Sequence, residues 1–144
     1  MRQVREFEAF IGRTLPKQLR VLYTTVNGGC PRRRVVGGTD RLITSYLGIY
    51  GGRFVGKVSR GLDVYSVIQW LGERILVDDS FALPLVPFAE LFGGDYLCLD
   101  YRASGVLPTV VVWLHELSHD LAPETYPVGN AFTDFLSRCV PAEG

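Results

Sequence analysis

The chain has 144 residues, which is the size of one domain, so we expect a single domain over residues 1–144. It is 47% hydrophobic and 21% charged, values that exclude a disordered or fibrous chain and are typical of a globular domain. Three widely spaced cysteines, Cys30, Cys98 and Cys139, exclude a disulfide scaffold.

The formal net charge is zero, but the charges are unevenly distributed along the chain. Residues 1–60 contain 12 Lys or Arg and 3 Asp or Glu, whereas residues 61–144 contain 3 and 12. The two parts therefore carry formal charges of +9 and −9. Either they pack together and neutralise each other, or they form two oppositely charged faces, one of which attracts a charged partner.

The spacing of apolar residues predicts four helices. Their expected positions are residues 4–11, 16–26, 61–73 and 132–139. Gly12 and the string Asn27-Gly28-Gly29 are typical of helix C-termini and end the first two helices. Because five side chains lie on apolar stripes at helical spacing, we expect them in the core: Leu19, Leu22, Phe132, Phe135 and Leu136.

Other stretches favour strands, and residues 30–41 are expected to form a loop. The expected strands are residues 42–50, which Gly51-Gly52 would close, 75–77, 83–89, 95–101 and 109–114. The two prolines of 83–89 suit an edge strand or an extended segment, and the 102–108 loop joins the last two strands into an antiparallel hairpin. Helices and strands segregated in this way predict an α+β fold.

The string His115-Glu116-Leu117-Ser118-His119 matches the H-E-x-x-H pattern of zinc hydrolases. That chemistry requires a helix, which places both imidazoles on one face for zinc and leaves Glu116 as the general base. The preceding residues 110–113 favour a strand and Pro123 follows shortly afterwards, so we do not expect a helix. We interpret the string as a chance match at a strand end and keep a zinc-dependent hydrolase as an alternative function.

Other patterns do not point to a ligand. The Gly-Gly pairs lack the spacing of a phosphate-binding loop and favour turns. The run Arg32-Arg33-Arg34 lacks interleaved aromatic residues, which favours a solvated loop, or a patch that pairs with the acidic part of the chain, over a nucleic-acid site. The pair Asp78-Asp79 is typical of a turn. We therefore predict no catalytic residue, no metal and no cofactor.

Neither a leader nor a membrane segment is expected. Glu6 and Glu8 interrupt the N-terminal residues before an apolar stretch can form. The longest uncharged run, residues 103–115, falls short of the roughly 18 residues of a membrane span. We expect a cytoplasmic protein without membrane association.

Several short segments occur in an order that resembles the SUKH superfamily. They are Phe7-Glu8-x-x-Ile11-Gly12-x-x-Leu15-Pro16, Asn27-Gly28-Gly29, Leu85-Val86-Pro87-Phe88-Ala89-Glu90, Gly93-Gly94-Asp95-Tyr96-Leu97-Cys98-Leu99-Asp100-Tyr101, Val110-Val111-Val112-Trp113-Leu114-His115-Glu116 and Ala131-Phe132-x-x-Phe135-Leu136. The resemblance spans about residues 4–139, and residues 30–82 match least. It implies an α+β fold with a central, mostly antiparallel sheet flanked by helices.

The resemblance also implies a non-enzymatic binding function. Bacterial members of the superfamily are thought to neutralise a cognate toxin, often a nuclease, whereas fungal members regulate cell-wall assembly. We expect an immunity protein whose partner is a toxin domain rather than nucleic acid, with a regulatory scaffold as the alternative. Because a nuclease is basic, the expected contacts are acids near turns or strand ends: Asp78, Asp79, Glu90, Asp95 and Glu116. For Asp95, which follows Gly93-Gly94, stabilisation of the turn is the alternative role.

Overall fold

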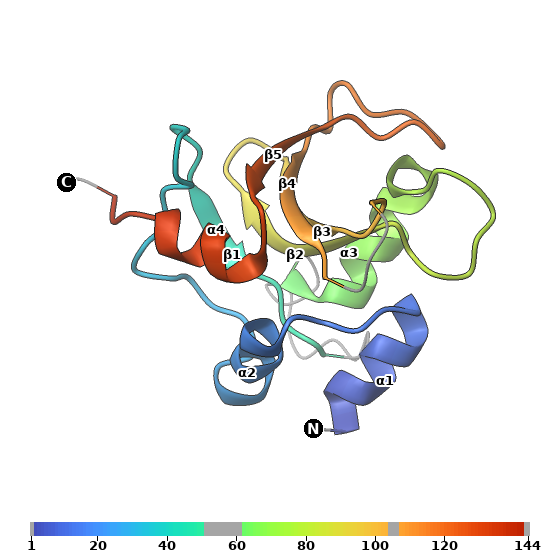
Figure 1. Ribbon diagram of the computed structural model, residues 1–144, viewed down its shortest axis with the longest axis horizontal. Helices are drawn as coiled ribbons and strands as arrows, with labels where there is room; N and C mark the ends of the chain where they lie inside the picture. Colours follow the sequence, from blue (N-terminus) through green and yellow to red (C-terminus); the bar gives the residue numbers. More distant parts are fainter. Residues whose placement is uncertain (1, 51–61, 104–106, 143–144) are drawn as a thin grey trace.

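The computed structural model describes residues 2–50, 62–103 and 107–142. Its elements are α1 (Arg2–Ile11), α2 (Lys17–Thr25), β1 (Ile43–Tyr46), α3 (Val64–Leu71), the 3-10 helix η2 (Gly72–Ile75), β2 (Leu85–Leu91), β3 (Tyr96–Asp100), β4 (Thr109–Trp113), β5 (Thr125–Gly129) and α4 (Phe132–Arg138). The strands form one antiparallel sheet in the order β1-β2-β3-β4-β5 (Figure 1). The predicted α+β fold is confirmed.

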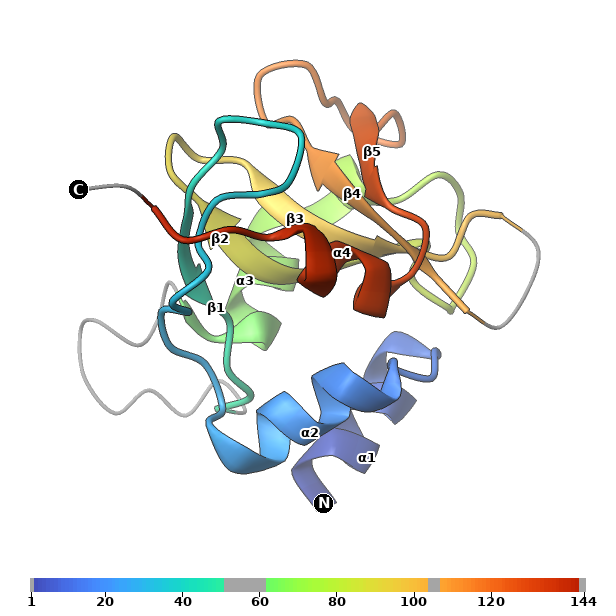
Figure 2. The same cartoon turned by 60° about the vertical axis from the view of Figure 1, so that its left-hand side comes forward.

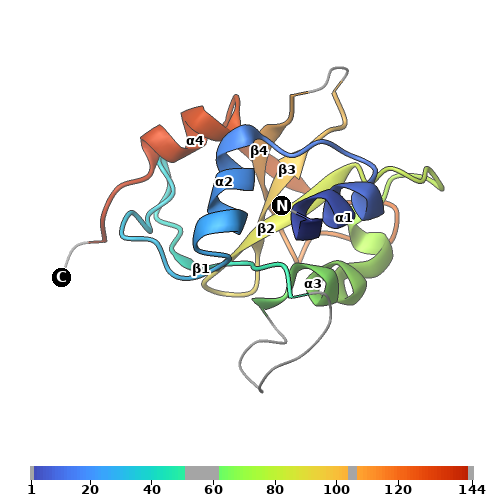
Figure 3. The same ribbon diagram turned by 90° about the horizontal axis from the view of Figure 1, so that it is seen from below.

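Helices lie on both sides of the sheet. Helix α4 packs on β4 and β5, α3 packs on β2, and Figure 3 shows α4 and α3 on opposite sides. Helices α1 and α2 contact each other, and α2 also lies beside α4 (Figures 2 and 3). Among the described residues, none of the helices combines the length and the apolar composition needed to cross a membrane.

An aromatic cluster around Phe88 of β2 lies at the centre of the core. The Phe88 ring centroid is 5.3 Å from that of Phe132, 5.6 Å from that of Phe135 and 5.8 Å from that of Tyr46. Leu19, Phe132 and Phe135 are buried, as predicted. Leu22 and Leu136 are half-buried and pack against this core.

All four predicted helices are present, and the third begins later and ends earlier than its apolar spacing predicts. Asp63 is its N-cap, because the Asp63 carboxylate accepts hydrogen bonds from the Ser66 backbone N–H at 3.1 Å and the Ser66 hydroxyl at 2.8 Å. Gly72, with φ of +57°, then ends the α-helical conformation at Leu71. Residue 61, the first of the expected 61–73 helix, lies outside the described residues.

Two strand predictions are wrong. The expected strand at 75–77 is absent, because residues Gly72–Ile75 form a separate 3-10 helix after α3 and residues 77–79 bend. Strand β2 lies between β1 and β3 and is not an edge strand. Its Pro87 is tolerated because the register shifts between Pro87 and Ala89, which places the proline at an irregularity of the ladder.

Strand β1 is shorter than the expected 42–50. The Leu47 N–H still donates to the Phe88 carbonyl of β2, and the chain then leaves the sheet: the Gly48 N–H donates to the Leu62 carbonyl, and the Val64 N–H donates to the Gly48 carbonyl. The expected closing turn at Gly51-Gly52 lies outside the described residues. Strand β5 was not predicted, and its Pro127 fits because β5 is the last strand of the sheet.

Candidate functional site

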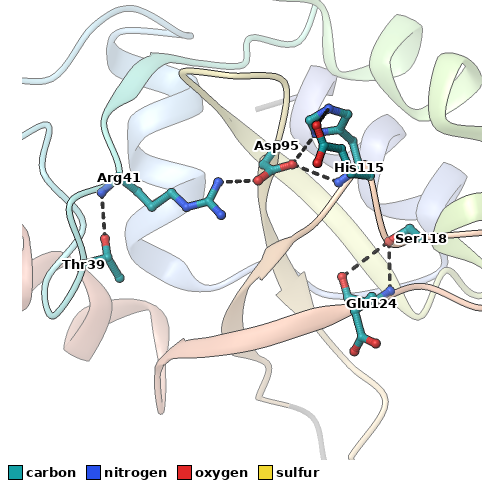
Figure 4. Close-up of polar contacts among 7 residues, drawn as sticks. Thr39, Arg41, Asp95, His115, Ser118 and Glu124 are labelled. Carbon is teal, nitrogen blue, oxygen red and sulfur yellow. Dashed lines mark hydrogen bonds and ion pairs between the residues drawn. The ribbon is translucent and has the colours of Figure 1, made fainter.

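At one end of the sheet, the Asp95 carboxylate bonds to two side chains that lie far from it in the sequence. It follows the Gly93-Gly94 turn between β2 and β3, where both glycines have φ near +100°, and its side chain is only 7% exposed. One carboxylate oxygen accepts hydrogen bonds from the His115 backbone N–H at 2.8 Å and from His115 Nδ1 at 2.5 Å (Figure 4). The other oxygen forms an ion pair with Arg41.

These contacts determine the charge state of Asp95. Burial by itself would raise the pKa of the carboxyl, but the hydrogen bonds from His115 and Arg41 outweigh that effect and lower the pKa below its usual range. The hydrogen bond to Asp95 also raises the pKa of Arg41. The Arg41 guanidinium lies over the Tyr126 ring, 5.8 Å from its centroid, so the cation is held from two sides.

The string from His115 to His119 forms turns that follow β4, which ends at Trp113. The buried Ser118 hydroxyl accepts a hydrogen bond from the Glu124 N–H at 2.8 Å, and the Ser118 N–H donates to the Leu114 carbonyl at 3.0 Å. The prediction that this string is not a helix is confirmed, although its residues turn rather than extend a strand. Within residues 2–50, 62–103 and 107–142, no group of three His, Cys, Asp or Glu side chains could hold a metal ion.

The Asp95–His115 pair has the arrangement of an acid that orients a catalytic imidazole. The His115 side chain is 37% exposed, and its Nε2 atom lies 3.8 Å from Glu116 Oε1. Among the described residues, no hydroxyl or thiol is hydrogen-bonded to His115, and its ring lies against Gly94. We therefore interpret the pair as a structural contact, which connects the β2–β3 turn to the residues after β4.

The five predicted contact acids differ in exposure. Asp78, Asp79 and Glu116 are exposed in loops. Glu90 is half-buried on β2 and its carboxylate accepts a hydrogen bond from the Thr44 hydroxyl at 2.8 Å. Asp95 is buried in its bonds with Arg41 and His115, as its alternative role of stabilising the turn predicts.

The exposed acids belong to two loops that lie close together. The Leu121 N–H donates to the Glu73 carbonyl of η2 at 2.8 Å, and Trp113 Nε1 donates to the Arg74 carbonyl at 3.0 Å. Figure 1 shows both loops on the same side of the molecule. We call this surface the acidic loop face and define it by five exposed acids: Glu73 of η2, Asp78 and Asp79 of the loop after η2, and Glu116 and Asp120 of the loop after β4.

Exposed apolar side chains lie in the same loops and in the adjoining helix α3. They are Trp70, Val77, Phe81, Leu117 and Leu121.

Hydrogen bonds from the Ser80 side chain and backbone N–H lower the pKa of Asp78, so this carboxyl stays charged to lower pH than usual. Arg41–Asp95 is the one ion pair between the basic and acidic parts of the chain among the described residues.

A comparison with protein families identifies the chain. The model of the SMI1 / KNR4 family (SUKH-1) matches residues 2–138. The chain belongs to this SUKH-1 family. Comparisons with curated proteins and with solved structures gave no match.

The SUKH-1 match extends from the first residue of α1 to the last residue of α4. It therefore includes residues 30–82, where the resemblance read from the sequence is weakest, and both loops of the acidic loop face. Arg41 and His115 were not predicted as partners of Asp95. The one local signal was the Gly93-Gly94-Asp95 string, which indicates a turn but not what the carboxylate binds.

Proposed function

We propose that this SUKH-1 protein is a non-enzymatic binding protein of the immunity type, which neutralises a cognate toxin domain by covering its surface. The observation that supports this function best is the acidic loop face, where exposed acids and exposed apolar side chains lie together. A partner with a basic surface, such as a nuclease that approaches phosphates, is complementary to these acids. The apolar side chains supply contacts that exclude water at the centre of an interface.

The arrangement of the histidines favours binding over catalysis. A zinc hydrolase would need both imidazoles on one helical face, whereas His115 to His119 lie in turns and His115 Nδ1 is bonded to Asp95. Occlusion requires only a complementary surface of about 800 Å² on each partner. The proposed contacts are Asp78, Asp79 and Glu116, with Glu90 as a peripheral contact.

The first experiment tests whether the partner is a toxin. The protein is co-expressed and co-purified with the product of the gene directly upstream, and growth of the host is measured with and without it. We expect a stable complex and restored growth. A neighbouring product that is neither toxic nor bound would contradict the immunity function and favour a regulatory scaffold.

The second experiment tests the surface. Asp78→Lys combined with Asp79→Lys should slow association with the toxin domain and reduce its dependence on salt, because electrostatic steering acts on the association rate. Glu6→Lys combined with Asp40→Lys changes the net charge equally at exposed acids outside this face and is the matched control. Equal association rates for the two double variants would exclude the acidic loop face as the contact.

A further inference from the structure

An apolar groove lies beside α2, on a part of the molecule separate from the acidic loop face. Its volume is about 550 Å³, within the range of ligand sites in proteins. Helix α2 forms one wall, Leu136 of α4 contributes to another, and Tyr46 and Leu47 extend it at the end of β1. The adjacent segment from Gly28 to Pro31 completes the lining. Figures 2 and 3 show α2 and α4 side by side.

The groove exposes apolar side chains that the described residues leave uncovered. Val21 is 50% exposed and Val26 is 65% exposed, although both belong to the apolar lining. Leu22 and Leu136 are half-buried between these exposed side chains and the core. An apolar groove beside a helix has the form that accepts the apolar face of a second helix.

The charges around the groove indicate which kind of helix is complementary to it. Lys17 is the one charged side chain among its described lining residues. Arg32, Arg33 and Arg34 follow Pro31 directly and are exposed, and Arg138 follows Leu136 by two positions on α4. Arg138 lies 3.9 Å from Asp134, which also accepts the Asn130 N–H, so this pair adds no net charge and the basic character comes from Lys17 and the Arg32–Arg34 run. The rim is therefore basic, and it disfavours pairing with the same rim of a second copy.

We propose that this groove binds an amphipathic helix of a partner protein, with apolar residues on one face and acidic residues on its flanks. The apolar face would fill the groove between α2 and α4, and the acids would lie near Lys17 and the Arg32–Arg34 run. This proposal does not depend on the immunity function, since the groove and the acidic loop face differ in both position and charge.

The probe is a displayed library of random peptides of about 16 residues, a length at which an isolated helix can form. Selection against the intact protein should enrich peptides that combine apolar residues at helical spacing with a net negative charge. Occupancy is read at Cys30, which is exposed and lines the groove, whereas Cys98 and Cys139 are buried. A selected peptide should slow the reaction of Cys30 with a thiol reagent. The effect should grow with the fraction of protein that carries peptide and reach about tenfold at saturation.

Two variants locate the site. Val21→Glu and Lys17→Glu should each weaken binding of the selected peptides by about tenfold or more, which is about 1.4 kcal/mol. Leu107→Glu replaces another exposed apolar residue outside the groove and should leave the affinity unchanged. Both groove positions lie on the exterior of α2, where glutamate is a good helix former, so the variants should fold.

Several outcomes would overturn the proposal. They are a selection that enriches no peptide, one that enriches basic peptides, and peptides that bind Val21→Glu as well as they bind the unchanged protein. Protection of Cys30 that rises with protein concentration in the absence of peptide would show that a second copy occupies the groove. None of these results bears on association at the acidic loop face, so failure of this proposal is distinguishable from failure of the immunity function.

Discussion

Val35 and Val140 pair with each other although they lie far apart in the sequence. The Val35 N–H donates to the Val140 carbonyl at 2.9 Å, and the Val140 N–H donates to the Val35 carbonyl at 3.0 Å. On its other side, the segment around Val35 runs along β1, where the Ile43 N–H donates to the Arg34 carbonyl at 2.7 Å. The residues after α4 are thereby tied to the outer edge of the sheet.

This contact requires a glycine at position 37. A Cβ atom at Gly37 would lie 2.3 Å from the Arg138 carbonyl oxygen, closer than nonbonded atoms approach. We expect Gly37→Ala to lower the free energy of unfolding by about 1–3 kcal/mol, measured by urea denaturation. Adding Arg138→Ala should not restore stability, because the clash is with the backbone and the retained Cβ. A double variant that recovers the lost stability would contradict this explanation.

Asp95 is expected to contribute to stability through Arg41 and His115. Asp95→Asn removes the charge and leaves the Arg41 guanidinium without its anion, which should cost about 2–3 kcal/mol of unfolding free energy at neutral pH. Asp79→Asn is the control, because Asp79 is exposed in a loop. Chemical denaturation of both variants measures the difference. Equal stabilities would show that the Asp95 cluster does not stabilise the fold.

The lowered pKa of Asp95 also predicts a dependence of stability on pH. Because the folded protein holds this carboxyl ionised, the unfolded chain binds the proton first as the pH falls. The stabilisation is complete above the ordinary carboxyl pKa of about 4 and is lost as the pH falls through the lower pKa of the folded state. Unfolding free energies measured across this acid range should fall less steeply in Asp95→Asn. Identical slopes in the two proteins would exclude Asp95 as a source of the acid sensitivity.

Local sequence patterns predict much of this fold, because apolar spacing is a property of neighbouring residues. They predict α1 and α2, whose buried side chains follow one face, and β3 and β4, which are buried along most of their length. They miss β5, since Pro127 disfavours a strand and only the position at the sheet edge accommodates it. The Asp95 cluster is not predictable in this way, because Arg41 and His115 lie 54 and 20 positions from Asp95.

Two buried tyrosines differ in how their hydroxyl groups are bonded. The Tyr101 hydroxyl donates to the Thr14 carbonyl at 2.7 Å, whereas the Tyr23 hydroxyl has no hydrogen-bond partner among the described residues. Burial raises the pKa of both. Tyr23→Phe should leave the free energy of unfolding unchanged or raise it by about 1 kcal/mol, and Tyr101→Phe should lower it by about 1 kcal/mol. Urea denaturation measures both free energies. An equal loss in the two variants would contradict this difference in hydrogen bonding between the two hydroxyl groups.

The His115–His119 string is not expected to bind zinc tightly. His115 Nδ1 is bonded to Asp95, and the two histidines lie in turns that do not place their rings on one helical face. Elemental analysis of protein purified without a histidine tag should find well below one zinc per chain. One tightly held equivalent that disappears in both His115→Ala and His119→Ala would show that the string is a metal site.

The order of the strands determines which pairing carries the largest entropic cost. Each strand pairs with its neighbour in the chain, so the β2–β3, β3–β4 and β4–β5 pairings close only the turns and loops between them. The β1–β2 pairing instead closes a loop that contains all of α3 and η2. Loop-closure entropy grows with the logarithm of loop length, so doubling the enclosed chain adds only about 0.6 kcal/mol. Insertions between β1 and β2 are therefore tolerated at small entropic cost, provided that Asp63 still begins α3.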